Sequence, residues 1–179
     1  TDLILPAGYE QLVVNGQMES DRNWTTVGPD ASITFTESAA FQGSTGYSVS
    51  SNQQGDGIES ARFELTQTGL YTAQARVRVN SGAIRLKLTQ GGDFNSIAEF
   101  NETTLGTTNG EWDTIRVDFT LPPGTTYEDY ADIANSGLAL QVVADGAGGA
   151  SFDIDDVQVI YGGEWEIESS PRAFDRDIL

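Results

Sequence analysis

Residues 71–79 read YTAQARVRV, a stretch in which small or apolar side chains alternate with polar ones. Successive side chains of a β-strand point to opposite faces of its sheet, so the alternation predicts a strand with one dry face. Ser81 and Gly82 follow as a turn signal, and residues 84–89, IRLKLT, resume the alternation with apolar side chains facing inward. We therefore expect the two strands to form a β-hairpin. Its outward polar side chains include Gln74, Arg76, Arg78, Arg85 and Lys87.

The same two-residue period recurs along the chain, whereas helical periodicity is nearly absent. Alternating strands are expected at residues 115–119, 138–142 and 152–159, and weaker ones at 32–36, 46–50 and 58–65. The phase of the alternation reverses between Ile154 and Val157, which predicts a bulge near Asp155 and Asp156. One helical turn is expected at residues 127–133. About eight to ten antiparallel strands indicate an all-β sandwich of the jelly-roll type.

The chain has 179 residues, which is the size of one domain. It contains no cysteine and no histidine, so disulfides, thiolate nucleophiles, Cys/His zinc sites and an imidazole base are excluded. Nine basic and 27 acidic residues give a formal net charge of -18, which disfavours nucleic acid and anionic membrane surfaces as partners. No apolar stretch approaches the roughly 18 residues of a membrane-spanning helix. We expect one domain over residues 1–161 and a charged tail or linker over residues 162–179.

Six short motifs follow one another in the order found in a known family. They are Asn15-Gly16-Gln17-Met18-Glu19, Trp24, the segment from Gly43 to Val49, Gly69-Leu70-Tyr71, Gly110-Glu111-Trp112 and the segment from Ile154 to Val159. In this order they resemble the jelly-roll carbohydrate-binding modules of families 4, 9 and 22, whose fold is galactose-binding-domain-like. Met18 stands where those modules usually have an aromatic residue. The resemblance covers residues 12–161 and implies that Trp24 and Trp112 pack into the core.

The resemblance also implies a structural calcium ion between the opening motif and the closing strand. Calcium takes about six to eight oxygen ligands and needs neither histidine nor cysteine. Carboxylates would come from Glu19 and from Asp155 or Asp156, with backbone carbonyls near Asn15 and Ser44 completing the shell. The ion would fasten the first and last strands together. The alternative is a solvated acidic turn at the two aspartates.

In modules of this type the concave sheet is the usual ligand-binding face, and the resemblance places the outward hairpin residues there, with Gln141 on a possible neighbouring strand. Sugar rings stack on exposed aromatic side chains. The candidates for such contacts are Phe94, Tyr127 and Tyr130. Four of the nine basic residues would share one face, which suits a uronic or sulfated glycan or the carboxylates of another protein. The alternative is internal pairing of these cations with Glu64, Glu99 or Asp118.

These features favour an extracellular, non-catalytic module that attaches a secreted enzyme or a surface protein to polysaccharide. No nucleophile elbow, phosphate-binding loop or HExxH motif is present, and adjacent carboxylates arise by chance in so acidic a chain. A second hypothesis is a structural or adhesion module of a virion, pilus or surface layer. In that case the tail at residues 162–179 would dock on a neighbouring subunit, and the ordered fold would serve assembly.

Overall fold

The structure, a computed structural model, describes residues 11–63, 69–89, 103–121 and 138–161. These residues form ten strands and one short 3-10 helix, η1 (Glu37–Ala39). The strands are β1 (Trp24–Val27), β2 (Ala31–Thr36), β3 (Gly46–Ser51), β4 (Gly57–Ser60), β5 (Gly69–Ser81), β6 (Ile84–Thr89), β7 (Thr103–Leu105), β8 (Asp113–Leu121), β9 (Ala139–Ala144) and β10 (Ala150–Tyr161). Within these ranges no helix is long and apolar enough to cross a membrane.

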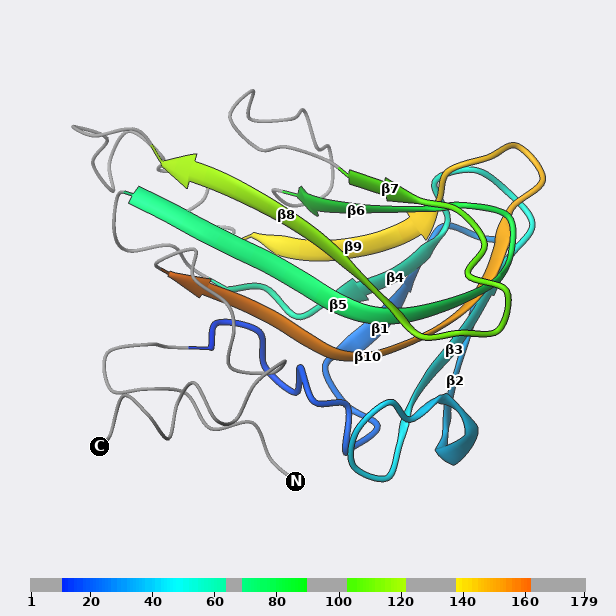
Figure 1. Cartoon of the computed structure of the whole chain (residues 1–179), viewed down its shortest axis with the longest axis horizontal. Coiled ribbons are helices and arrows are strands. Elements are labelled where there is room, and N and C mark those ends of the chain that lie inside the picture. Colours follow the sequence, from blue (N-terminus) through cyan, green and yellow to red (C-terminus); the bar gives the residue numbers. More distant parts are fainter. Residues whose placement is uncertain (1–10, 64–68, 90–102, 122–137, 162–179) are drawn as a thin grey trace.

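The ten strands pair antiparallel in two five-stranded sheets that form a jelly-roll sandwich. One sheet has the order β2-β3-β10-β5-β8 and is called the β10 sheet; the other has the order β1-β4-β9-β6-β7 and is called the β9 sheet. Figure 1 shows β5 lying between β8 and β10, and β6 lying between β7 and β9. The antiparallel sandwich predicted from the two-residue period is confirmed.

The core lies between the sheets and is built from the inward side chains of both. Tyr71 on β5 and Phe119 on β8 stack with their ring centroids 5.3 Å apart. Trp24 is 5% exposed, and its indole N–H donates to the carbonyl of Asn15 at 2.9 Å, which satisfies the donor that burial removes from water. Each large apolar side chain that becomes fully buried contributes about 1.5–3 kcal/mol. The alternation therefore determines which face of each strand is buried and contributes this free energy to folding.

The predicted bulge is confirmed in β10, the central strand of its sheet. The register against β5 shifts between Asp155, which faces Arg76, and Gln158, which faces Gln74. Asp156 takes a positive φ of 50° at this point. The extra residue brings the inward side chains before and after the bulge into the core, because it restores their common phase.

The predicted hairpin is wrong. β5 pairs with β10 and β8, whereas β6 pairs with β9 and β7, so the turn after Ser81 carries the chain from one sheet to the other. Gly82 at this crossing has a φ of 75°, and a Cβ there would lie 2.3 Å from the carbonyl oxygen of Gly149. Alternation determines which side chains face the core but not which strand is the neighbour. The outward side chains of β5 and β6 therefore lie on opposite faces of the sandwich.

Other expectations differ in smaller ways. The strand expected at residues 58–65 is observed as β4, followed by an isolated bridge between Phe63 and Leu138. Trp112, expected in the core, is half-buried and packs beside Phe41 outside the β10 sheet. The helical turn expected at 127–133 and the tail at 162–179 lie outside the described residues.

Candidate functional site

The outer face of the β9 sheet, called the β9 face, carries a row of polar side chains that crosses four strands. Antiparallel registers place Thr25 of β1 opposite Glu59 of β4, Glu59 opposite Gln141 of β9, and Gln141 opposite Lys87 of β6. Neighbouring strands lie about 4.8 Å apart, so the three steps span about 14 Å. The row thus follows from register alone and runs across the strands.

Gln141 sits at the centre of this row. It is 8% exposed, and its side-chain nitrogen donates a hydrogen bond to the carboxylate of Glu59. Lys87, on the other side of Gln141, is half-buried, and its side chain has no hydrogen bond or ion pair with any residue that the structure describes. The row therefore combines an ionic acceptor, an oriented amide and an ammonium donor in a partly desolvated setting.

Arg85 lies two residues before Lys87 on β6 and bounds the same face. Its guanidinium donates to the carboxylate of Asp145 from Nε at 2.9 Å and from Nη2 at 2.5 Å. The two side chains remain 33% and 23% exposed, respectively. Asp145 follows the last residue of β9, so the Arg85–Asp145 pair lies at one end of the β9 face. The β3–β4 loop contacts the same end, because Gln54 Nε2 donates to the Asp145 carbonyl at 3.3 Å.

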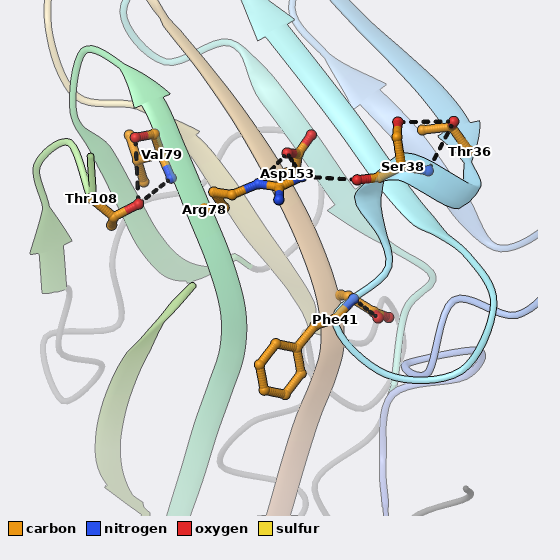
Figure 2. A network of polar contacts seen from close by, with 8 residues as sticks. Thr36, Ser38, Phe41, Arg78, Val79, Thr108 and Asp153 are labelled. Atoms are coloured by element: carbon orange, nitrogen blue, oxygen red, sulfur yellow. Dashed lines mark hydrogen bonds and ion pairs between the residues drawn. The ribbon is translucent and has the colours of Figure 1, made fainter. Parts of the chain in front are cut away.

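The outer face of the β10 sheet, called the β10 face, holds the predicted residues from β5. Figure 2 shows Arg78 reaching across to Asp153 on β10 and to the loop after β2. Nε and Nη2 donate to Asp153 Oδ2 at 2.9 and 2.7 Å, and Nη2 also donates to the Ser38 carbonyl at 2.8 Å. The guanidinium carbon lies 4.9 Å from the ring centroid of Trp112. Arg78 is therefore bound by its own chain.

Arg76 and Gln74 are also engaged within the β10 face. Arg76 donates to the hydroxyl of Thr114 on β8, and its guanidinium carbon lies 5.1 Å from the ring centroid of Phe41. Gln74 is buried. The expectation that all four cations share one face is corrected: Arg85 and Lys87 lie with Gln141 on the β9 face, whereas Arg76 and Arg78 lie on the β10 face. The cause is the sheet crossing after β5.

Two of the residues expected to bind calcium hold the loop at residues 41–45 from its two ends. Glu19 accepts hydrogen bonds from the backbone N–H groups of Ser44 at 3.0 Å and Thr45 at 3.4 Å. Asp155 Oδ2 accepts from the N–H groups of Phe41 at 2.7 Å and Gln42 at 2.9 Å. Burial raises the pKa of Asp155 to about 7, and these backbone donors oppose the rise.

Gly43 shows how closely the loop fits. It has a φ of 68°, and a Cβ there would lie 2.2 Å from Oε1 of Glu19. The carboxylate occupies the place that any larger side chain needs. The loop therefore depends on glycine at this position both for its backbone conformation and for its contact with Glu19.

The donor set does not fit a calcium ion as it is arranged. The Asn15 carbonyl already accepts from Trp24 Nε1 at 2.9 Å and from the Met18 N–H at 3.1 Å, and Asp156 Oδ1 accepts from Gln158 Nε2 at 3.2 Å. N–H groups point at the carboxylates of Glu19 and Asp155, where a cation would need oxygens. No group of three or more acidic side chains in the described ranges is placed to hold a metal. The calcium site stays a prediction that this geometry does not support.

Sequence reasoning missed Glu59, Asp145 and Asp153, the acidic partners on the two faces. The sequence does indicate that Glu59 faces outward, since it lies between Ile58 and Ser60, which face inward. The pairing of each acid with its cation depends on strand order, which has no local signal. Phe94, Tyr127 and Tyr130, the predicted aromatic contacts, and Glu64 and Glu99, the alternative ion-pair partners, lie outside the described residues. Asp118 pairs with Arg116 at 3.1 Å.

Comparison with known proteins gives likenesses of fold. No family model and no curated protein matches the sequence. The C-terminal family 22 carbohydrate-binding module of Clostridium thermocellum Xyn10B is 16% identical, with a TM-score of 0.57 over 86% of this chain and 92% of that one. TmCBM61, solved in complex with β-1,4-galactotriose, is 19% identical, with a TM-score of 0.56 over 84% and 97% of the two chains.

An enzymatically active domain shares the architecture as well. That domain, from bacteriophage CBA120 tailspike protein 4, is 17% identical, with a TM-score of 0.54 over 83% of this chain and 21% of that one. At these identities the likenesses concern the arrangement of the strands and leave chemistry open. This chain has the jelly-roll fold of the carbohydrate-binding modules.

Proposed function

We propose that this domain is a non-catalytic module that binds polysaccharide on the β9 face. The observation that carries the proposal is the cross-strand row of Glu59, Gln141 and Lys87. It presents acceptors and donors at the spacing of adjacent strands, on rigid secondary structure at the centre of a sheet. Two solved relatives of the fold are carbohydrate-binding modules, one of them in complex with an oligosaccharide, and this supports the choice of ligand.

The polar groups suit the hydroxyls of a sugar chain. A hydroxyl both donates and accepts, so a carboxylate, an amide and an ammonium in one row are complementary to several hydroxyls of one chain. The Glu59 to Gln141 hydrogen bond fixes the amide before a ligand arrives. Because the groups are pre-ordered on strands, binding loses less conformational entropy than it would on a mobile loop.

The charges of the face favour an uncharged polysaccharide over a uronic or sulfated one. Among the residues of this face that the structure describes, Glu59 and Asp145 contribute two negative charges and Lys87 and Arg85 two positive charges, so these four sum to zero. The whole chain has a net charge of -18 and repels polyanions. We further propose that the module is extracellular and attaches a secreted enzyme or a surface protein to its polysaccharide.

The test is affinity electrophoresis in gels that contain xylan, β-1,4-galactan or mixed-linkage β-glucan, followed by calorimetry on the best ligand. Lys87→Ala and Gln141→Ala are each expected to weaken binding about 10-fold or more, because each removes a hydrogen bond from a partly desolvated row. Arg116→Ala is the matched control, since it removes one positive charge from the exposed outer side of β8 on the opposite sheet.

Three results would contradict the proposal. In the first, none of the polysaccharides retards the wild-type protein. In the second, Lys87→Ala and Arg116→Ala lose binding equally. In the third, the protein cleaves the polysaccharide to shorter chains. Absence of retardation combined with concentration-dependent self-association would favour the assembly role instead.

A further inference from the structure

Phe41 is an exposed aromatic side chain with a fixed position. Three large hydrophobic side chains are exposed in the described ranges, namely Val14, Phe41 and Leu70, and of these only Phe41 is aromatic, at 37% exposure. Its ring meets the half-buried ring of Trp112 edge to face, with centroids 5.4 Å apart and planes inclined by 61°. The two rings come from different loops, residues 37–45 and residues 106–112, and form one aromatic ridge on the β10 face.

The backbone beneath Phe41 is fixed independently of its side chain. The buried carboxylate of Asp155 accepts the N–H groups of Phe41 and Gln42, and the Arg78 to Ser38 hydrogen bond holds the beginning of the same loop. Figure 2 shows the ring of Phe41 projecting beside the strands while its N–H group is bound. Substitution of the side chain therefore leaves the loop's anchoring hydrogen bonds in place.

Trp112 is fixed in a similar way. Thr108, in the loop before it, exchanges hydrogen bonds with Val79 on β5, with the Thr108 N–H donating to the Val79 carbonyl and the Val79 N–H donating to the Thr108 hydroxyl, both at 3.0 Å. The guanidinium groups of Arg76 and Arg78 stack on Phe41 and Trp112, respectively. Each guanidinium covers part of one ring face, and Phe41 remains 37% exposed.

A ring that only fills space is normally turned inward, as Phe119 and Trp24 are in this chain. Keeping an aromatic ring at the surface forgoes part of its burial free energy, and doing so on a rigid backbone is the arrangement that stacking on a sugar ring requires. The Thr114 hydroxyl and the Ser38 carbonyl lie at the same arginines, where each accepts a hydrogen bond from a guanidinium group.

We propose that Phe41 and Trp112 form a second sugar-stacking surface on the β10 face, for the same uncharged polysaccharide class. The inference rests on the proposed function for the choice of ligand. It adds that each domain contacts polysaccharide on two opposite faces, because the two loop rings lie against Arg76 and Arg78 on the β10 face, and the β9 face belongs to the other sheet. One domain then bridges two polysaccharide chains.

The test compares Phe41→Ala, Lys87→Ala and the double variant in the same xylan and β-1,4-galactan gels. Phe41→Ala is expected to weaken retardation about 3- to 10-fold, and the double variant to abolish it. Phe41→Trp should restore binding, because it returns an aromatic face. Leu70→Ala is the matched control, since it shortens another exposed hydrophobic side chain on the same sheet. Thermal unfolding of each variant establishes that it is folded.

The outcomes separate the two proposals. If Phe41→Ala binds as wild type does while Lys87→Ala does not bind, the second surface is wrong and the β9 site stands. If Phe41→Ala alone abolishes binding and Lys87→Ala changes nothing, the aromatic ridge binds the polysaccharide and the β9 site is wrong. Equal losses in Phe41→Ala and Leu70→Ala, or wild-type protein that neither gel retards, overturn the second surface.

Discussion

The two outer faces of the sandwich receive cationic side chains from consecutive strands, and the chain uses them in different ways. On the β10 face, Asp153, Ser38 and Trp112 all contact Arg78. On the β9 face, Arg85 is also paired, with Asp145, and its side chain is 33% exposed against 27% for Arg78, whereas Lys87 has no described side-chain partner. An outward position on an alternating strand therefore does not make a cation available to a ligand. The segments that cross the face decide whether it is.

Asp153 reaches Arg78 from the neighbouring strand β10, and the loop at residues 37–45 adds further contacts on this face. It lies against the β10 face because Asp155, on the central strand of that sheet, binds its backbone at Phe41 and Gln42, and Glu19 binds it at Ser44. Once anchored, the loop brings the Ser38 carbonyl to Arg78 and the Phe41 ring to Arg76. Asp155, at the bulge of β10, thus holds the loop against the polar outer side chains of this sheet.

The largest expected effect is on the engaged face. Arg78→Ala should lower the free energy of unfolding by about 3 kcal/mol, because it leaves the nearly buried carboxylate of Asp153 without its cation. Arg85→Ala should lower it by about 0.5–1 kcal/mol, since both members of its ion pair are partly solvated. Urea denaturation of the two variants measures the contrast directly.

Arg78→Lys serves as the control for that comparison. It keeps the positive charge but loses the planar fork that contacts both Asp153 and Ser38, so its stability should fall between wild type and Arg78→Ala. Equal destabilisation by Arg78→Ala and Arg85→Ala would mean that the two faces are alike.

A smaller effect is expected from the loop's anchor. Asp155→Asn should lower the free energy of unfolding by about 2 kcal/mol, because one acceptor oxygen becomes an N–H donor facing backbone N–H groups. Thermal and urea unfolding provide the measurement. Glu111→Gln is the matched neutralisation, because Glu111 is exposed and its side chain has no described hydrogen bond. If Asp155→Asn is as stable as Glu111→Gln, the Asp155 carboxylate does not anchor the loop.

The fold could be predicted from the sequence because burial of one strand face produces an apolar–polar alternation within each segment. The inward phase of residues such as Tyr71, Ile84 and Phe119 is set by their own segments, and so is the bulge between Asp155 and Gln158. Most side chains that face the core are apolar wherever their strand is placed in the sheet, and a polar one such as Ser60 has its hydroxyl hydrogen-bonded. The two-layer architecture and the inward face of most strands are therefore predictable without knowledge of strand order.

The candidate site was less accessible, because it depends on which strands are neighbours. Residues 71–89 carry a turn signal that fits a hairpin as well as a crossing between sheets, and only the pairing of β6 with β9 places Lys87 beside Gln141. Phe41 lies in a loop, where no periodicity indicates exposure. Its position follows from a hydrogen bond to Asp155, 114 residues later in the chain.

The smallest expected effect concerns calcium. Chelation with EDTA, after incubation in millimolar calcium, should leave the Tm of the wild-type protein unchanged, because backbone N–H groups already donate to the carboxylates of Glu19 and Asp155. An ion bound at 100 times its Kd would add about 2.7 kcal/mol, enough to raise the Tm by about 5 to 10 °C. If chelation lowers the Tm of the wild-type protein by that amount and leaves the Tm of Glu19→Gln unchanged, the loop rearranges around an ion. The amide contacts of the β10 face would then belong only to the metal-free protein, and the contrast between the two faces would depend on calcium.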